Sequence, residues 1–258
     1  MAIYITGDTH GTYDVNKFMK IKDMLTEDDY IIVLGDFGIC WDNSGHDNIV
    51  RNFWSSFECT VLFVDGNHEN HTLLNSYPIS EWNGGKVHAI GDKIKHLMRG
   101  QIFEIEGKTF FTMGGAASHD CGEKLEQYIM ENLDDYHQAD WNTIYATWRS
   151  KYYYGCRTPG RSWWAEEIPS PTEIAEAKEN LAKAGNKADY VLTHAASRRV
   201  FNHLGFTNER SWDGILLDFF DYIEENIQFD NWWFGHLHTD FIYDERHIGF
   251  YDTIREAK

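Results

Sequence analysis

Short apolar runs alternate with amphipathic stretches along the first third of the chain. Apolar runs of about four to eight residues are typical of buried strands, and apolar positions repeating every three or four residues are typical of helices. These patterns predict strands at 2–6, 30–34 and 60–64 and helices near 14–25, 46–57 and 69–76. Strands and helices that alternate in this way favour parallel strand pairing in an α/β fold.

The pattern changes between 86 and 113, where short alternating segments are broken by glycine at 99–101 and 106–108. Glycine permits the tight turns of antiparallel hairpins, so this region predicts a second sheet or a meander. Residues 123–154 are acidic and aromatic, and we predict that they are largely helical.

The start of one helix is marked residue by residue. Ser170 can cap it, Pro171 suits its first position, Glu173 completes a capping box, and Gly185 can close its far end. We therefore predict a helix over about 171–184. The rest of the chain predicts strands at 188–193 and 229–234, a helix near 213–225 and a closing hairpin around 239–252.

Composition adds limits to this picture. At 258 residues without an internal repeat, the chain predicts a single domain, 1–258, with a helical and aromatic insertion at about 115–170. The formal net charge of -18 disfavours extended nucleic acid and membrane surfaces as partners. The chain shows no signal peptide and no apolar stretch near the roughly 20 residues of a spanning helix, so we expect a cytoplasmic protein.

Its four cysteines are scattered, which predicts reduced thiols at Cys40, Cys59, Cys121 and Cys156.

Five predicted strands end in the same kind of residue. A carboxylate, a carboxamide or an imidazole follows each of the strands at 2–6, 30–34, 60–64, 188–193 and 229–234. Ligands of open α/β sheets collect at the carboxyl ends of the strands, so these side chains should meet at one edge. We call the seven residues concerned the strand-end cluster: Asp8, His10, Asp36, Asn67, His194, His236 and His238.

Oxygen and imidazole donors without a thiolate suit ions such as Mn²⁺, iron, Zn²⁺ or Co²⁺. Seven donors exceed what one tetrahedral ion uses, and two ions that share a bridging carboxylate would account for the number. Taken singly, each residue has a structural alternative as a helix cap, a turn former or a buried histidine. The repetition at five strand ends is what predicts a metal centre.

The blocks GDTHG, GDFG, GNHE, TH and GHLH follow one another between residues 7 and 238. This ordered set resembles the calcineurin-like metallophosphoesterase superfamily, whose blocks read GDxH, GD, GNH[DE], H and GHxH. The resemblance implies an α/β fold in which two mixed β-sheets pack as a sandwich flanked by helices. It also implies a phosphoester hydrolase with two divalent ions drawn from Mn, Fe, Zn, Co and Ni, with Mn favoured.

The resemblance also implies roles for single residues. Asp36 would bridge the ions, and His68 falls where the family has a catalytic histidine. A hydroxide between the ions would attack phosphorus in line while His68 protonates the leaving oxygen or stabilises its charge. The other cluster members would divide between the two ions, with Asp8, His10 and His238 on one and Asn67, His194 and His236 on the other.

The second block departs from one branch of the superfamily. Protein serine/threonine phosphatases and symmetrical dinucleoside tetraphosphatases continue it as GDxVDRG, which supplies an Asp that orients the catalytic histidine and an Arg that binds phosphate. Ile39 and Cys40 stand at those positions here. Asp42 or Glu69 could replace the acid in part, or could be turn or solvent-facing groups.

Two segments are candidates for substrate contacts. KYYYGCRTPGRSWW clusters aromatic residues around Arg157 and Arg161, and guanidinium groups suit phosphate oxygens. Its aromatic residues could equally fill a core or a subunit contact, and its arginines could pair with acidic residues. GGAASHD, at 114–120, could bring His119 and Asp120 toward the cluster, or could be a plain glycine turn.

We therefore predict a dinuclear metal-dependent phosphoester hydrolase, with monoesters favoured over diesters. The expected substrate is a phosphorylated small molecule or a phosphoprotein, and the oligomeric state is left open. One alternative is a phosphodiesterase acting on small nucleotide diesters. Another is a non-catalytic, metal-stabilised binding protein, which the retention of His68 and all seven cluster residues disfavours.

Overall fold

The structure is a computed structural model that describes residues 1–118, 120, 121, 125, 127, 129, 131, 157–206, 212 and 214–258. The predicted helical segment 123–154 lies almost entirely outside the described residues, as do His119 and Cys156. Cys40 and Cys59 are free and buried, as predicted, and Cys121 is buried.

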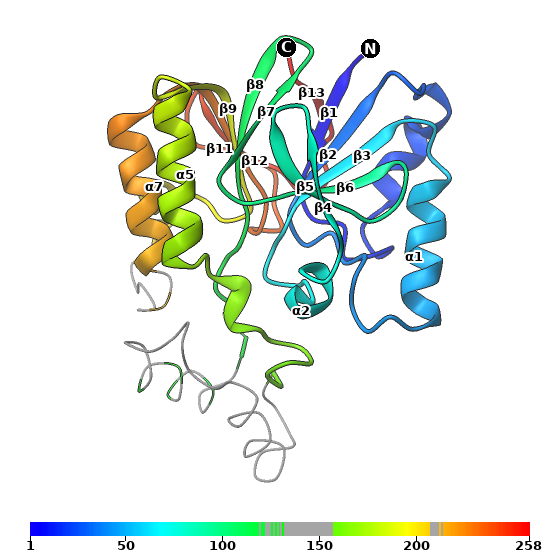
Figure 1. Cartoon of the computed structure of the whole chain (residues 1–258), viewed down its shortest axis with the longest axis horizontal. Coiled ribbons are helices and arrows are strands. Elements are labelled where there is room, and N and C mark those ends of the chain that lie inside the picture. Colours follow the sequence, from blue (N-terminus) through cyan, green and yellow to red (C-terminus); the bar gives the residue numbers. More distant parts are fainter. Residues whose placement is uncertain are drawn as a thin grey trace.

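Two mixed β-sheets form the centre of the molecule (Figure 1). The first has the order β13 (Arg255–Glu256), β1 (Ile3–Thr6), β2 (Tyr30–Leu34), β3 (Thr60–Val64), β6 (Ile94–Leu97), β5 (Gly85–Ala89) and β4 (Ile79–Trp82). The second has the order β11 (Phe241–Ile242), β12 (His247–Gly249), β10 (Gln228–Phe234), β9 (Lys187–Thr193), β8 (Lys108–Met113) and β7 (Gln101–Ile105).

The strands next to the centre of each sheet run parallel, and hairpin strands flank them. In the first sheet β1, β2, β3 and β6 are parallel, whereas β13 and the β4–β5 and β5–β6 pairs are antiparallel. In the second sheet β8, β9, β10 and β12 are parallel, whereas β7 and β11 are antiparallel. The predicted α/β fold with two mixed sheets is confirmed.

Strands such as β2 are apolar at every position because both of their faces are covered. Ile32 and Leu34 belong to the core between the two sheets, together with Phe103 and Leu192 from the second sheet. Ile31 and its alternate neighbours point the other way, into the core under the helices. Successive side chains of a strand point to opposite faces, so a continuous apolar run marks a strand buried on both sides.

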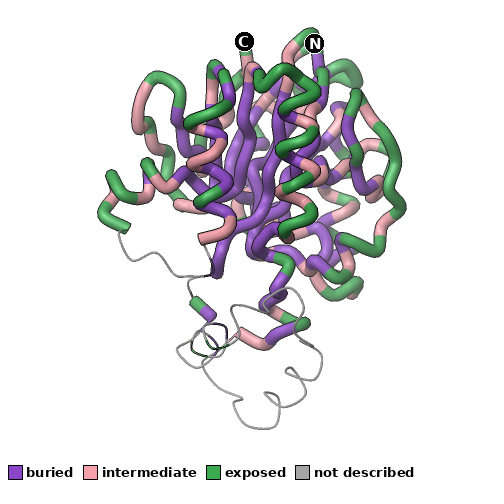
Figure 2. The backbone as a smooth tube through the Cα atoms, turned by 60° about the vertical axis from the view of Figure 1, so that its left-hand side comes forward, coloured by how far each residue is buried: buried purple, intermediate pink, exposed green. Residues whose placement is uncertain are grey.

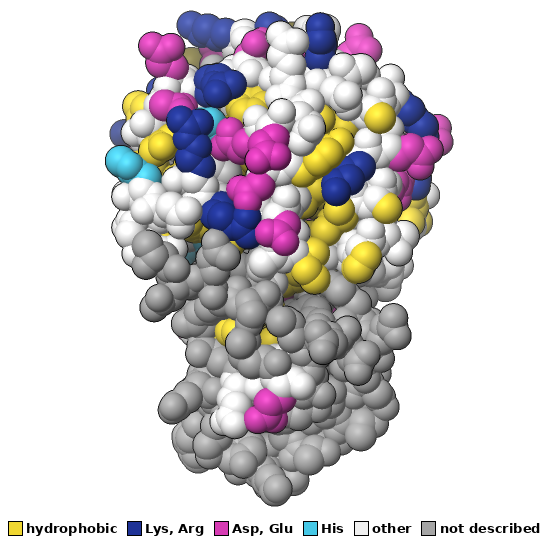
Figure 3. Space-filling model, turned by 90° about the vertical axis from the view of Figure 1, so that its left-hand side faces the viewer, with side chains coloured by type: hydrophobic (Ala, Val, Ile, Leu, Met, Phe, Trp, Pro, Cys, Tyr) yellow, Lys and Arg dark blue, Asp and Glu magenta, His cyan; other side chains and the backbone are white. Residues whose placement is uncertain are grey.

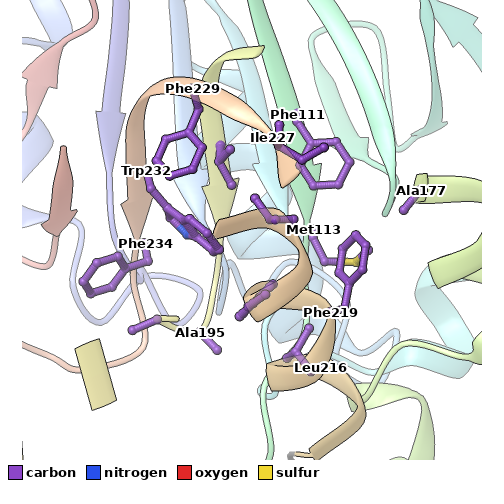
Figure 4. Packing of buried hydrophobic residues seen from close by; sticks show 14 of the residues in the cluster. Phe111, Met113, Ala177, Ala195, Leu216, Phe219, Ile227, Phe229, Trp232 and Phe234 are labelled. Carbon is purple, nitrogen blue, oxygen red and sulfur yellow. The ribbon is translucent and has the colours of Figure 1, made fainter. Parts of the chain in front are cut away.

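Helices cover the outer face of each sheet. Over the first sheet lie α1 (Gly45–Ser55), α2 (His71–Leu74) and the 3₁₀ turns η1 (Asn16–Lys20) and η2 (Lys22–Met24). Over the second lie α5 (Pro171–Lys183), α6 (Arg198–His203) and α7 (Gly214–Asn226), and η4 (Ala165–Glu167) precedes α5. Figure 4 shows how Leu216 and Phe219 of α7 pack toward Phe111 and Trp232 of the sheet. Figure 2 shows the buried strands enclosed by more exposed helices.

Helix α5 begins as its sequence predicts. Ser170 accepts a hydrogen bond from the backbone N–H of Glu173, and the Glu173 carboxylate accepts one from the backbone N–H of Ser170, with Pro171 in the first turn. Both halves of the capping box are therefore present, which satisfies N–H groups that a helix start otherwise leaves free.

Two predicted helices are corrected by the structure. The segment 14–25 forms the 3₁₀ turns η1 and η2 instead of an α-helix, because Val15, Phe18 and Ile21 repeat every three residues. The amides of Phe18 and Ile21 accordingly bind carbonyls three positions back. The helix expected near 69–76 is a single turn, α2. The elements β4, α6 and β13 were not predicted. Each is too short to give a pattern that can be recognised in the sequence.

The face that α5 and α7 present carries acidic and basic side chains side by side (Figure 3). Lys183 pairs with Glu179 at 2.8 Å within α5, and Arg198 of α6 pairs with Asp218 of α7 at 2.6 Å. Such mixed charge is typical of solvent-facing helices. Every helix in the described part of the chain is too short or too polar to cross a bilayer.

Candidate metal centre

The structure brings the five strand ends together below β1, β2, β3, β9 and β10 in the orientation of Figure 1. Backbone hydrogen bonds join them, since the His10 amide donates to the Asp36 carbonyl and the Gly235 amide donates to the His194 carbonyl. Side chains also cross between strands: the His236 amide donates to Asp8 Oδ1 over 3.0 Å, although the two residues are 228 positions apart. The seven residues of the strand-end cluster thus share one edge of the sandwich.

Asp36 lies in the middle of the cluster and is almost fully buried. Its Oδ2 is 3.4 Å from Nε2 of His10, and its Oδ1 is 3.4 Å from Nε2 of His194. Oδ1 also accepts a 2.7 Å hydrogen bond from the His68 amide. Burial raises the pKa of the Asp36 carboxyl, but His194 and His10 outweigh it and hold the pKa well below its ordinary value. The two oxygens of one ionised carboxylate therefore face two different imidazoles.

One side of the cluster has a carboxylate oxygen without a hydrogen bond. Asp8 is fully buried, and its Oδ2 lies 3.1 Å from Nε2 of His238 but accepts no hydrogen bond within the described part of the chain. Asp8, His10, Asp36 and His238 each offer a ligand atom, and these atoms lie within 4.8 Å of one another. A buried carboxylate oxygen that accepts no hydrogen bond is costly, and four ligand atoms so close together fit a bound cation.

The other side of the cluster contains His194, Asn67 and His236. Nε2 of His194 lies 3.2 Å from Oδ1 of Asn67, and the rings of His194 and His236 meet edge to face with centroids 4.9 Å apart. Nδ1 of His194 lies 2.8 Å from the Leu34 carbonyl, which can only accept, so Nδ1 carries a proton. That hydrogen bond leaves Nε2 directed at Asp36 and Asn67, as in metal-binding imidazoles.

Residues behind the cluster orient it. Asp14 Oδ2 binds Nδ1 of His10 over 2.7 Å, which directs Nε2 of His10 toward Asp36. The Tyr251 hydroxyl donates to Asp14 Oδ1 over 3.0 Å, and the Tyr251 ring stacks on His238 with centroids 5.1 Å apart. A carboxylate behind a histidine is the usual support of a metal-binding imidazole.

Local backbone geometry explains why glycines precede the cluster residues. A Cβ on Gly66 would lie 2.1 Å from Asp36 Oδ1, and a Cβ on Gly235 would lie 2.4 Å from Asp8 Oδ1. The backbones of four cluster residues are left-handed, with φ between 42° and 68° at His10, Asp36, His236 and His238. Non-glycine residues adopt this region rarely and at a cost of about 1–3 kcal/mol, and such strain gathers at functional sites.

The electrostatics of the cluster favour cations. Burial lowers the pKa of His10, but Asp36 and Asp14 outweigh it and raise that pKa to about 9. In the same way Asp36 and Asp8 raise the pKa of His194 to about 10 against its burial. The carboxylates thus hold protons on imidazoles that a metal ion would displace on binding. Carboxylate, carboxamide and imidazole donors without a thiolate fit divalent ions such as Mn²⁺, Zn²⁺ or Co²⁺.

His68 borders the cluster and has an unexpected neighbour. Its ring meets His10 edge to face with centroids 5.3 Å apart, and Nη2 of Arg157 lies 2.8 Å from its Nε2. Arginine only donates hydrogen bonds, so Nε2 of His68 accepts. Burial lowers the pKa of His68, and the charge of Arg157 lowers it further, against the opposing effect of Asp36. Of the other predicted substrate contacts, Arg161 is exposed and His119 lies outside the described residues.

The two acids considered as replacements for the missing aspartate bind backbone amides. Glu69 accepts hydrogen bonds from the amides of Phe37 and Gly38, at 2.6 and 3.3 Å, and burial raises its pKa to about 8. Asp42 is exposed and accepts a hydrogen bond from the Ser44 amide. Within the described part of the chain, neither carboxylate contacts the His68 ring.

Sequence reasoning did not assign a role to several residues that support the cluster. Asp14 lies four positions after His10, a spacing that could have indicated the pair. Ser118 accepts from Nδ2 of Asn67 over 3.3 Å and donates to Glu167 Oε2 over 2.6 Å. Ser118 and Glu167 are 49 positions apart in the sequence, and no local pattern connects them.

The family comparison agrees with this geometry. Residues 1–240 match the family model of the calcineurin-like phosphoesterases, so the chain belongs to that family, as its ordered blocks predict. The crystal structure of a phosphopantetheinyl hydrolase from Mycobacterium tuberculosis is similar, with a TM-score of 0.40 and 14% sequence identity over 97% of this chain and 90% of that one. A search of curated proteins found no match. The chain is a metal-dependent phosphoester hydrolase.

Proposed function

We propose that this hydrolase is a phosphomonoesterase with two divalent ions in the strand-end cluster. The observation that carries the proposal is the position of Asp36, whose two oxygens face His10 on one side and His194 on the other. A carboxylate placed in this way is suited to bridge two ions, and two-metal sites are typical of phosphoester hydrolysis.

The residues on each side of Asp36 define the two proposed sites. Asp8, His10 and His238 would bind one ion, where the buried Asp8 Oδ2 accepts no hydrogen bond within the described residues. Asn67, His194 and His236 would bind the other, where Asn67 Oδ1 and His194 Nε2 lie 3.2 Å apart. Mn²⁺ is the proposed ion, as the resemblance to the family implies, and a donor set of hard oxygens and imidazole accepts it.

When bound, the ions supply positive charge for the phosphoryl oxygens and lower the pKa of water to provide a nucleophile. Asp36 lies between the two sites and fixes their positions relative to each other. Asp14 orients the imidazole of His10, and the Leu34 carbonyl orients that of His194. His68 stands at the border of the cluster, where an imidazole can protonate a leaving oxygen or stabilise the charge that develops on it.

The proposed substrate is a phosphate monoester of a small molecule or a protein. The acidic chain, with a net charge of -18, repels extended nucleic acid. A small nucleotide diester is the alternative substrate, because it would be influenced mainly by the local charge of the ions.

The test is an initial-rate assay of the metal-stripped protein on p-nitrophenyl phosphate and bis-p-nitrophenyl phosphate, titrated with Mn²⁺, Zn²⁺, Ni²⁺ and Mg²⁺. We expect metal-dependent turnover that favours the monoester and is lost in Asp36→Asn. Asp42→Asn is the matched control, since it makes the same chemical change on an exposed turn. Full activity in a folded Asp36→Asn variant would contradict the proposed centre, and faster diester turnover would contradict the monoester preference.

A further inference from the structure

Arg157 places a guanidinium beside the cluster. Its Nη2 lies 2.8 Å from Nε2 of His68, and the ring of His68 in turn meets that of His10. Lys17, another basic side chain near the cluster, donates to the backbone carbonyls of Gly7 and Asp8. Within the described part of the chain, Arg157 is therefore the cationic side chain in contact with the His68 ring.

The Arg157 side chain is held in place from several directions. Its Nε lies 2.6 Å from Asp120 Oδ1, and its Nη1 donates to the Ser162 carbonyl over 3.3 Å. The backbone amide of Arg157 donates to the Cys121 carbonyl over 3.1 Å, so segments from 120–121 and 157–162 meet at this point. The side chain is only 9% exposed. The guanidinium is fixed before any substrate binds, which reduces the entropy lost on binding.

A guanidinium has five N–H donors in a planar fork. Contacts to Asp120, Ser162 and His68 use three of them, and two remain without an acceptor in the described part of the chain. The planar fork matches the oxygens of a phosphoryl group, and charge-assisted bonds of this kind are about twice as strong as neutral ones.

We propose that Arg157 binds the non-bridging oxygens of the substrate phosphoryl group beside His68, and that Asp120 is the positioning residue for this guanidinium. The inference rests on the proposed two-metal function of the cluster and names the substrate class, a terminal phosphate. A monoester carries two negative charges and three terminal oxygens near neutral pH, whereas a diester carries one charge and two such oxygens. A fixed cation therefore favours the monoester.

The test uses Arg157→Gln, Arg157→Lys and Asp120→Asn in the full chain. Lys108→Gln is the charge-matched control, because Lys108 is the first residue of β8 and the cluster lies beyond the other end of that strand. We measure kcat/KM for p-nitrophenyl phosphate and for bis-p-nitrophenyl phosphate. Binding of inorganic phosphate to the Mn²⁺-loaded protein is measured by calorimetry, and metal content is measured separately.

For Arg157→Gln we expect a loss of about 100-fold in monoester kcat/KM. The loss for the diester should be about tenfold, and phosphate should bind about tenfold more weakly. Arg157→Lys keeps the charge without the fork, so it should recover part of the loss. Asp120→Asn should lower kcat/KM for both substrates, as Arg157→Gln does, but by a smaller factor. Metal content should stay at the wild-type value.

Unchanged phosphate affinity and an unchanged monoester-to-diester ratio in folded Arg157→Gln and Arg157→Lys would overturn the inference. The inference would also be overturned if Lys108→Gln lowered kcat/KM and phosphate affinity as much as Arg157→Gln does, because the effect would then come from overall charge. If the wild type hydrolyses neither substrate with any ion, the proposed function fails instead, and phosphate binding still tests Arg157 by calorimetry.

Discussion

Replacing Gly66 by alanine would test how tightly the fold places the bridging carboxylate. A Cβ at this position would lie 2.1 Å from Asp36 Oδ1 and 2.3 Å from the Asp36 backbone nitrogen. Real Cβ atoms essentially never come closer than 3.0 Å to such atoms, so Asp36 has to move. The φ of Gly66 lies outside the left-handed region, so alanine adds no strain of its own there.

The required displacement is about 1 Å, and a misplacement of that size can cost about 100-fold in rate. Overpacking a dense interior costs about 1–3 kcal/mol of unfolding free energy, against a total of about 5–15 kcal/mol for a domain. Gly66→Ala should therefore remain folded while kcat/KM on p-nitrophenyl phosphate falls by about 100-fold and metal is retained more weakly.

Gly45→Ala is the matched control for this experiment. Gly45 is the first residue of α1, and a Cβ there meets nothing within 4 Å, so activity should be unchanged and stability equal or slightly higher. Urea unfolding, metal content after dialysis and initial rates would be measured for both variants. Wild-type kcat/KM and metal retention in Gly66→Ala would refute the argument that Asp36 has to lie where the structure places it.

Three further predictions concern the surroundings of the cluster. Ser118→Ala removes the acceptor of the Asn67 amide and should weaken metal binding by about tenfold in a calorimetric titration; unchanged affinity would show that Ser118 does not orient Asn67. In the metal-stripped protein, the pKa values of His10 and His194 are raised to about 9 and 10, above the ordinary 6.5. Their contribution to stability is complete below pH 6.5 and is lost as the pH rises through 9 to 10, so the urea midpoint should fall over this range; a flat profile would contradict these shifts. Lys17→Met leaves the backbone carbonyls of Gly7 and Asp8 without their donor and should cost about 1–3 kcal/mol in urea unfolding, a loss that an unchanged midpoint would exclude.

The sheet edge that carries the cluster could be predicted because its determinants are local. Ile31, Ile32 and their neighbours form an apolar run that can only be buried on both faces, and Gly35 and Asp36 follow it directly. A polar residue after a buried strand has to lie at the carboxyl end of that strand. Five such local patterns were sufficient to indicate one shared edge.

Contacts between distant segments could not be predicted in the same way. The approach of Arg157 to His68 depends on 120–121 meeting 157–162, and no periodicity encodes that meeting. The same applies to the hydrogen bonds that link Asn67 through Ser118 to Glu167. The 3₁₀ turns after β1 were missed for a different reason, since a repeat of three residues is close to the helical repeat over so short a segment.

The wide separation of the cluster along the chain has a consequence for biosynthesis. A growing chain that has emerged through β9 contains Asp8 and Asp36 but lacks His236 and His238, which follow β10. Until β10 pairs with β9, the carboxylates face one another without these imidazoles. The segment β10 is synthesised only after β9, α6 and α7, so the pairing that brings these imidazoles to the carboxylates forms late in synthesis. We therefore expect metal binding to be a late step of folding. The enzyme would first bind the ions that are present when β10 docks.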